Sequence, residues 1–233
     1  MSSLTRLKTD IIDFIFPKIC IVTDERLSDD NSNDFIADEV FSKIEKVKDE
    51  DLTLIKAKIN SDFFFSRYAF VHDNEMQTLV HYLKYKGFSK IGTYLGETIG
   101  NILAKKFQEN LSGYRYIHPV PLFDTKERER GYNQSQFICK GICKATGLEI
   151  RNDIVYRKRY TKSQTGLSYT ERARNVRDAF ELKKKFNPGS VKEGIIVVDD
   201  VITTGSTIKE VIRTLKQNLD VKIGAVSVCL AKD

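Results

Sequence analysis

The segment from Gly194 to Thr207 constrains the fold more than any other part of the chain. It begins with a short apolar run rich in β-branched residues, which predicts a strand buried on both faces. Asp199 and Asp200 follow at the point where this strand should leave the sheet. After a loop of small residues come apolar positions with the spacing of a helix, namely Ile208, Val211, Ile212 and Leu215. This order of strand, acid pair, small polar loop and helix predicts an α/β protein with a ligand site here.

The loop itself, Thr203-Thr204-Gly205-Ser206-Thr207, has the properties of a phosphate-binding site. A helix start offers free backbone N–H groups and the positive end of the helix dipole, and small hydroxyl residues add donors without bulk. The two aspartates beside the loop suit ribose hydroxyls and a hydrated magnesium ion. The alternative is an ordinary strand-to-helix turn with Ser206 or Thr207 as the N-cap. We favour the phosphate site, because a cap needs only one such residue.

Composition sets the broad class. A chain of 233 residues, 41% of them hydrophobic, suits one medium domain with an appendage. The 38 basic and 32 acidic residues give a net charge of +6, which allows phosphorylated small molecules or nucleic acid as partners. The four cysteines form no Cys-x-x-Cys pair, so we expect free thiols in a reducing compartment. No apolar run is long enough to span a membrane, and we expect a cytoplasmic, soluble protein without membrane insertion.

Apolar periodicity predicts the remaining elements. Helices are expected over residues 4–15, 40–47, 76–83, 91–107, 133–145 and from 206 onward, and strands over 52–59, 63–71, 116–122, 154–156, 194–198 and 222–230. From residue 115 onward strands alternate with helices, so we expect a parallel sheet with right-handed crossovers. Gly92, Gly96 and Gly100 lie four residues apart on one expected helix, which predicts the close approach of a neighbouring backbone. The basic segment 157–177 is interpreted as mobile or ordered by a ligand.

Two sets of residues carry a resemblance to known families. Asp199-Asp200, two residues, Thr-Thr-Gly, a small residue and Thr resemble the phosphoribosyl-diphosphate (PRPP) loop of type I phosphoribosyltransferases. Further blocks make the chain similar to the competence protein F (ComF) family, namely Phe16-Pro17-Lys18-Ile19-Cys20, Leu83-Lys84-Tyr85-Lys86-Gly87, Pro119-Val120-Pro121-Leu122, Arg128-Glu129-Arg130-Gly131-Tyr132-Asn133-Gln134, and Arg157, Thr161, Gln164, Leu167, Arg172, Asn175-Val176 and Ala179-Phe180. Most of these blocks lie between about residue 75 and the end of the chain.

The resemblance implies a type I phosphoribosyltransferase fold, a Rossmann-like parallel sheet flanked by helices. Residues 1–50 would form an N-terminal segment and 51–233 the transferase-like domain, with 51–110 contributing the hood and 111–233 the core sheet. ComF-like proteins usually begin with a four-cysteine zinc finger. Here Cys20 stands alone, with Thr23 in the place of its partner, and one thiolate cannot build a tetrahedral zinc site. We therefore expect no zinc and a degenerate zinc-finger region.

The function implied by the resemblance is a Mg²⁺-dependent phosphoribosyltransferase that binds PRPP and transfers phosphoribose to an unidentified acceptor. Asp199 and Asp200 would be catalytic and would lie near the Mg²⁺, and residues 203–207 would bind the 5′-phosphate. Candidates for the pyrophosphate side are Pro121, Leu122, Arg128, Arg130 and Arg172. We interpret Lys84 and Lys86 as cations that suit a helix end, and His118 as structural. The sequence leaves the oligomeric state open.

The alternative function is a non-catalytic accessory protein of competence and DNA uptake. It would bind PRPP or a nucleotide, or single-stranded DNA, beside a helicase-like competence protein. The basic segment 157–177 would then contact DNA, and such binding should weaken steeply with salt. The net charge of +6 is a weak footprint for nucleic acid, so this alternative depends mainly on the resemblance.

Overall fold

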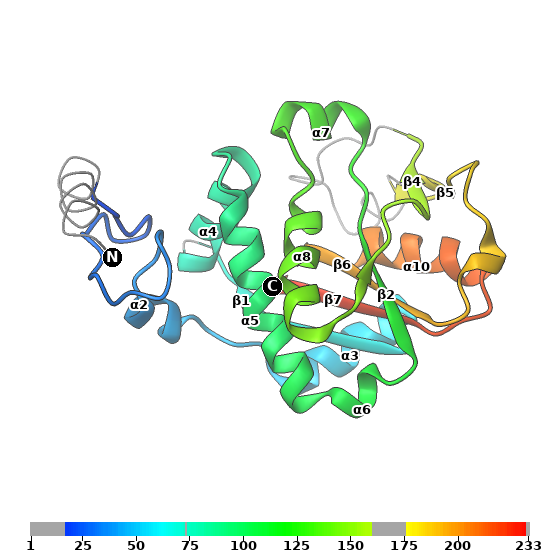
Figure 1. Ribbon diagram of the computed structural model, residues 1–233, viewed down its shortest axis with the longest axis horizontal. Coiled ribbons are helices and arrows are strands. Elements are labelled where there is room, and N and C mark those ends of the chain that lie inside the picture. The colour runs from blue at the N-terminus through cyan, green and yellow to red at the C-terminus, as the bar shows by residue number, and fades with distance from the viewer. Residues whose placement is uncertain (1–16, 73, 160–175, 232–233) are drawn as a thin grey trace, which may run out of the picture.

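A five-stranded parallel sheet forms the centre of the molecule (Figure 1). The computed structural model describes residues 17–72, 74–159 and 176–231. The strands lie in the order β1 (Phe63–Phe70), β7 (Ile223–Ala231), β6 (Gly194–Ile202), β2 (Tyr114–Pro119) and β3 (Glu149–Ile150), and each neighbouring pair is parallel. The predicted α/β class with a parallel sheet flanked by helices is therefore confirmed. A separate antiparallel pair joins β4 (Val155–Arg157) to β5 (Phe180–Leu182).

Helices cover both faces of the sheet and define two hydrophobic cores. On one face lie α4 (Glu75–Tyr85), α5 (Ser89–Lys106) and α8 (Gln134–Thr146), and on the other α3 (Asp49–Ile59) and α10 (Ser206–Asn218). Successive residues of β6 alternate between the two cores, as a strand buried on both faces requires: Ile196 and Val198 join the first, Ile195 and Val197 the second. The shorter helices are α2 (Asp38–Lys43), α6 (Gln108–Leu111), α7 (Asp124–Arg130) and the 3₁₀ turn η1 (Pro188–Ser190).

Helices α5 and α8 pack backbone against backbone, which confirms the close approach predicted from the glycine spacing. A Cβ at Gly96 would lie 2.2 Å from the carbonyl oxygen of Ile138. On the facing helix, a Cβ at Gly141 would lie 2.1 Å from the carbonyl oxygen of Thr93. Glycine is required at both positions because no side chain fits between the two backbones. This contact fixes α8, whose N-terminus lies at the carboxyl edge of the sheet.

Two expectations need correction. Residues 52–59 were expected to form a strand, and they belong to helix α3. The apolar residues of this segment alternate imperfectly, and its helical face is interrupted by charges. Neither the two-residue period of a strand nor the 3.6-residue period of a helix therefore dominates the sequence. The sheet also takes β1 from the segment expected to contribute the hood. The division of the chain at residues 50 and 110 otherwise stays a prediction. The expected helix over 4–15 and most of segment 157–177 lie outside the described residues.

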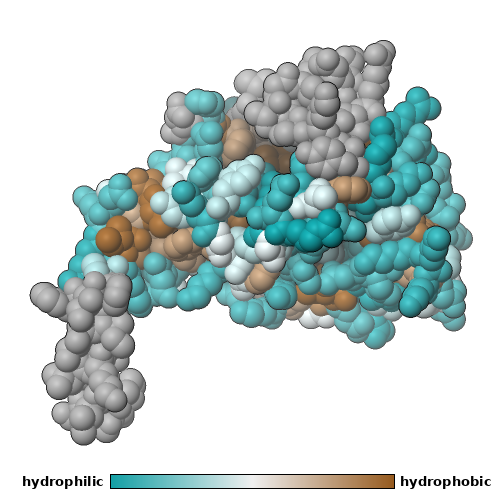
Figure 2. Space-filling model, turned by 90° about the horizontal axis from the view of Figure 1, so that it is seen from above, coloured by the Kyte–Doolittle hydropathy of each residue, from teal (hydrophilic) through white to brown (hydrophobic). Residues whose placement is uncertain are grey.

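The described part of the N-terminal segment begins with a small hairpin. Cys20 is buried, and its backbone N–H donates to the carbonyl of Glu25 at 2.8 Å. Ile19 forms an antiparallel bridge with Arg26. Figure 2 shows a mostly hydrophilic face with hydrophobic side chains gathered toward the end that carries this segment. Ile19, which belongs to the segment, is exposed. Within the described residues, we find no helix with the length and apolar character needed to cross a membrane.

Candidate functional site

The acid pair lies at the carboxyl end of β6, near the middle of the sheet. Asp199 and Asp200 are adjacent in a strand, so their side chains diverge. Asp199 lines a small cavity with the loop that follows, whereas Asp200 is buried and contacts helix α4. Asp199 Oδ1 accepts the backbone N–H of Asp200 at 2.9 Å and lies 3.4 Å from the hydroxyl of Ser135, at the start of α8. The two carboxylates therefore have different partners and can have different roles.

Lys84 is the partner of Asp200, and the sequence interpretation of this lysine as a helix-end cation missed it. Its Nζ lies 2.6 Å from Asp200 Oδ2, with the two side chains only 22% and 5% exposed. The segment that follows α7 and the end of α7 itself also contact the end of α4. The hydroxyl of Tyr132 donates to the carbonyl of Leu83, and the Arg130 guanidinium lies 5.3 Å from the ring centroid of Tyr85. Three blocks that are distant in sequence thus meet at the acid pair.

The surroundings push the pKa values of the two carboxyls apart. Burial raises the pKa of Asp199, and the neighbouring charge of Asp200 raises it further. Burial also opposes ionisation of Asp200, but the ammonium of Lys84 outweighs it and holds the pKa of Asp200 below its usual value. Lys84 responds in the same sense, since the attraction of Asp200 raises its pKa despite its burial. Asp200 is therefore the fixed anion, and Asp199 is the carboxyl whose charge can change when a ligand binds.

The loop after the acid pair has the geometry that its glycine allows. Gly205 adopts φ 77°, the left-handed conformation that glycine favours. A Cβ there would also lie 2.8 Å from the Ile59 side chain. The chain then enters α10 at Ser206, and the backbone N–H of Lys209 closes the first helical turn on the carbonyl of Gly205 at 2.9 Å. The first N–H groups of this helix therefore point toward the carboxyl edge of the sheet.

The loop encloses a cavity of about 20 Å³, lined by Asp199, Val201–Thr203 and Gly205–Ile208. The hydroxyls of Thr204 and Ser206 are hydrogen-bonded to each other at 2.8 Å. A volume of this size holds about one water molecule. A phosphate group is larger than this cavity, so binding one there would require side chains of the loop to move. The phosphate-binding role of residues 203–207 stays a prediction.

A second cavity, of about 290 Å³, lies at the carboxyl end of β2. Pro121 and Leu122 line it, and their assignment to the pyrophosphate side stays a prediction. It is also lined by Asn133, which donates from Nδ2 to the Val120 carbonyl at 3.0 Å, and by Arg157 and Lys183. The sequence analysis placed Arg157 in a basic segment with no defined position, and the structure places it at this cavity.

The other candidates for the pyrophosphate side are distributed differently. Arg128 and Arg130 belong to α7 rather than to a loop, and neither lines the second cavity. Arg130 is turned toward α4 and Gln134, donating to Gln134 Oε1 at 2.9 Å, and Arg128 is exposed. Arg172 lies outside the described residues. His118 is buried, and its Nδ1–H donates to the Arg151 carbonyl at 2.5 Å, consistent with a structural role.

Four cations influence this edge of the sheet. Burial lowers the pKa of Lys126, and the positive charges of Arg157, Arg130 and Lys84 lower it further, whereas Glu129 acts in the opposite sense. Burial likewise lowers the pKa of Arg157, while the nearby Asp199 opposes that shift. Positive charge held close enough to depress the pKa of a lysine attracts an anion. The edge combines cations with several carboxyls, because Asp124 and Glu127 line the second cavity and Asp199 and Asp200 lie at the end of β6.

Comparison with known proteins finds relatives named for competence and for DNA utilization. The chain is 37% identical over 101 residues to competence protein F of Haemophilus influenzae, covering 43% of this chain and 44% of that protein. It is 32% identical over 146 residues to the DNA utilization protein YhgH of Salmonella typhimurium, covering 61% and 62%. The homologous protein of Escherichia coli is 31% identical over 144 residues. The chain thus spans less than two thirds of the length of these relatives.

Structural comparison finds a hypoxanthine phosphoribosyltransferase from Staphylococcus aureus. The similarity has a TM-score of 0.37 at 12% identity and covers 58% of this chain and 62% of the other. No protein-family model matches the chain.

Proposed function

We propose that the protein binds PRPP together with Mg²⁺ and transfers its phosphoribosyl group to a nucleophile. The observation that supports this most is the site itself: an acid pair, the start of a long helix and several cations meet at one sheet edge. PRPP is an anion at both ends with a diol between them. The helix start and the cations suit its two anionic ends, and the acid pair suits the diol.

Each part of the site would have one task. The N–H groups at the start of α10 and the hydroxyls of residues 203–207 would bind the 5′-phosphate. Asp199 would accept the ribose hydroxyls, and Asp200 with Lys84 would hold that strand end in position. Arg157 and Lys183, at the second cavity, would stabilise the charge that develops on the leaving pyrophosphate. Such catalysis consists of positioning and charge stabilisation.

The residues present fit a magnesium ion that arrives with the ligand. Carboxylate oxygens are ligands that Mg²⁺ prefers, and it usually binds proteins through one or two of them plus phosphate oxygens and water. Within the described ranges, no group of three or more metal-ligating side chains comes together, so the remaining ligands would come from PRPP and water. The ion would supply charge neutralisation at the pyrophosphate.

Calorimetric titration with PRPP and Mg²⁺ tests this proposal. Asp199→Asn should weaken binding at least tenfold, because an amide cannot become the carboxylate that the ribose and the ion require. Asp220→Asn removes the same charge from an exposed position outside the site and should leave the affinity unchanged. The proposal fails if the unmodified protein does not bind PRPP or if Asp199→Asn binds it equally well. Release of pyrophosphate in the presence of an acceptor would distinguish transfer from binding alone.

A second candidate function is binding of single-stranded DNA, and one surface favours it. At the end of α4, Tyr85 and Phe88 are 64% and 41% exposed, and the Arg130 guanidinium lies beside the Tyr85 ring. Exposed aromatic rings among cations are the elements on which unpaired bases stack. The names of the relatives agree with a role in DNA use.

Titration of a fluorescent oligothymidylate at several salt concentrations tests the second candidate. Affinity should fall steeply as salt increases, and Tyr85→Ala should weaken binding about tenfold, since one stacked base contributes about 1–3 kcal/mol. Affinity that does not depend on salt, or that Tyr85→Ala leaves unchanged, would remove this candidate.

A further inference from the structure

The two carboxyls of the acid pair differ in whether the protein itself neutralises them. Lys84 Nζ lies 2.6 Å from Asp200 Oδ2, and the two side chains are only 22% and 5% exposed. Asp199 forms no ion pair within the described residues, and its Oδ1 accepts from the Ser135 hydroxyl and the Asp200 backbone N–H. Asp199 also lines the cavity of the loop, which Asp200 does not. The unliganded site therefore offers a ligand one carboxyl of the two.

The position of Lys84 is fixed by the packing of helix α4. The helix is anchored by four buried side chains, namely Met76, Leu79, Val80 and Leu83. Both neighbours of Lys84 in the chain have contacts of their own: the carbonyl of Leu83 accepts from the Tyr132 hydroxyl, and the ring of Tyr85 lies beside the Arg130 guanidinium. The ammonium of Lys84 is therefore held at the acid pair by the fold and does not reach it from a flexible surface position.

A cation at the end of a helix does not need to be buried. Lys86, two residues further along, is exposed and suits the same helix end. Taking an ammonium and a carboxylate out of water costs free energy, and apolar residues in place of such a pair are often as stabilising. The burial of Lys84 against Asp200 is therefore better explained by a role in the site than by stability alone.

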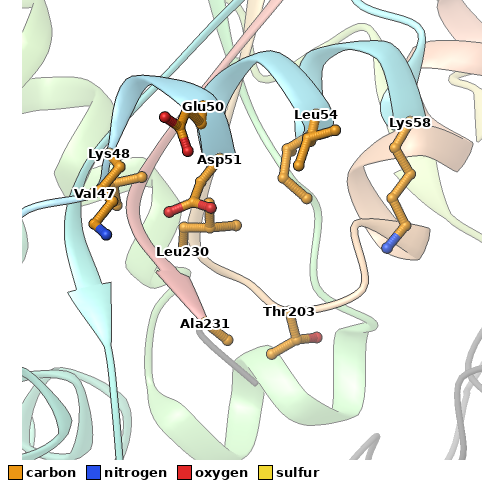
Figure 3. A pocket seen from close by; sticks show the side chains of 10 residues that line it. Val47, Lys48, Glu50, Asp51, Leu54, Lys58, Thr203, Leu230 and Ala231 are labelled. Atoms are coloured by element: carbon orange, nitrogen blue, oxygen red, sulfur yellow. The ribbon is translucent and has the colours of Figure 1, made fainter.

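No other cation of the described residues forms an ion pair with either carboxyl. Lys48 and Lys58 line a cavity of about 410 Å³ between helix α3 and the ends of β6 and β7 (Figure 3), and of the loop residues only Thr203 reaches that cavity. Arg157 and Lys183 line the second cavity. Neither carboxyl lines either of these cavities, so direct neutralisation of the acid pair depends on the ammonium of α4.

This neutralisation limits what the acid pair can offer a metal ion. Two free carboxylates would present two negative charges, whereas the acid pair with Lys84 presents at most one. Mg²⁺ gives up its water reluctantly and is usually bound through one or two carboxylates together with phosphate oxygens. With Asp200 paired to Lys84, the chain supplies one carboxylate, and the remaining anionic oxygens must come from the ligand.

We propose that Lys84 makes the binding of Mg²⁺ at the acid pair depend on PRPP. This inference rests on the proposed function. Lys84 neutralises Asp200 and leaves Asp199 as the one carboxylate offered to the ion, so the protein retains Mg²⁺ only when the phosphate oxygens of PRPP are present. Lys84 is thus a positioning residue that sets the order of binding, and it does not contact the reacting atoms.

Calorimetric titration of the full chain with magnesium chloride, without PRPP, tests the proposal. Lys84→Met should bind Mg²⁺ at least about tenfold more tightly than the unmodified protein, because a second carboxylate is no longer neutralised. Lys86→Met is the matched control: it removes the same charge from an exposed position two residues away and should change nothing. The double variant Lys84→Met/Asp200→Asn should return to the weak affinity of the unmodified protein, because the second carboxylate is absent.

Lys84→Gln repeats the test with less disturbance, because its amide can still donate to Asp200 although it carries no charge. Far-UV circular dichroism verifies that each variant is folded. The inference is overturned if neither Lys84 variant binds Mg²⁺ more tightly than Lys86→Met does. It is also overturned if the double variant gains as much affinity as Lys84→Met, since the gain would then not come from Asp200.

The same variants are titrated with PRPP and Mg²⁺ together, which separates this inference from the proposed function. Lys84→Met should bind PRPP with Mg²⁺ at least as tightly as the unmodified protein does. Weaker binding by Lys84→Met, but not by Lys86→Met, would show that Lys84 contacts the ligand directly and would overturn the inference. If Lys84→Met gains affinity for Mg²⁺ alone and no variant binds PRPP, the neutralising role of Lys84 stands and the proposed function fails.

Discussion

The two neighbouring aspartates should respond very differently to the same substitution. Asp200→Asn leaves the ammonium of Lys84 beside a neutral amide in a site where Asp200 is 5% exposed. Breaking a buried ion pair by removing one partner costs about 3–5 kcal/mol. Because Lys84 is 22% exposed and water can reach part of it, we expect a value near the lower limit, about 3 kcal/mol. Asp199→Asn replaces a carboxyl whose pKa is raised with a neutral group of similar size and should cost under about 1 kcal/mol.

A double-mutant cycle isolates the ion pair. Lys84→Met retains most of the aliphatic side chain and should also cost about 3 kcal/mol, because it leaves the Asp200 carboxylate buried without a cation. The double variant Lys84→Met/Asp200→Asn contains no unpaired charge. Its loss should therefore fall short of the sum of the single losses by about 2 kcal/mol or more.

Urea unfolding at pH 7, followed by far-UV circular dichroism, measures these free energies. The chain contains no tryptophan, so fluorescence is a poor alternative. Equal losses for Asp199→Asn and Asp200→Asn would refute the assignment of Asp200 as the fixed anion. Additive losses in the cycle would show that the Lys84–Asp200 contact contributes nothing to stability.

Three further predictions concern stability and the loop. Burial lowers the pKa of His118 from 6.5 to about 4, so the stability that neutral His118 contributes is complete above pH 6.5 and is lost as the pH falls toward 4, by about 2 kcal/mol at pH 5. In urea titrations, the His118→Asn variant should therefore lose about 2 kcal/mol less stability between pH 7 and pH 5 than the unmodified protein does. An equal loss in both proteins would contradict this prediction. Gly141→Ala, whose Cβ would lie 2.1 Å from a carbonyl oxygen, should cost about 3 kcal/mol, whereas Gly189→Ala in an exposed turn should cost under about 0.5 kcal/mol in the same assay. Gly205→Ala should weaken PRPP binding and cost more stability than Gly147→Ala. Both glycines have a positive φ, but of the two only Gly205 would place a Cβ within 4 Å of a neighbouring atom. Equal effects of the two substitutions would show that the loop tolerates the added methyl group.

Local signals predicted the parts of the fold that depend on neighbouring residues. The run from Gly194 to Thr207 carries a buried-strand composition, a turn glycine and a helical stripe in succession, and the structure follows that order. The glycines of α5 predicted a backbone contact, although not its partner on α8. Helix α3 was misassigned because charges occupy most of its surface and its apolar residues fit neither period well. Its stability comes from packing on β1 and α10, which the local pattern does not contain.

The candidate site was predicted where one segment carries it and was missed where distant segments meet. Lys84 lies in the last turn of a helix, where a cation needs no further explanation. Only the packing of α4 brings its ammonium to Asp200. Arg130 was assigned to the pyrophosphate side because it follows Pro121 in sequence, but α7 turns it toward Tyr85. The membership of Lys84 and Arg130 in two of the ComF-like blocks was the one signal that could have linked them to the acid pair.

The position of β7 has a consequence for how the chain folds during synthesis. This strand is the last described element, yet it lies between β1 and β6 and is bonded to both. Until the ribosome has produced β7, β1 has no partner strand in the sheet, and one edge of β6 stays open. The β1 side of the sheet can therefore assemble only after β7 has emerged, so its formation depends on contacts of long sequence separation. Until that moment the apolar residues of β1 are exposed in the nascent chain, and a chaperone that recognises extended apolar segments would have its binding site there.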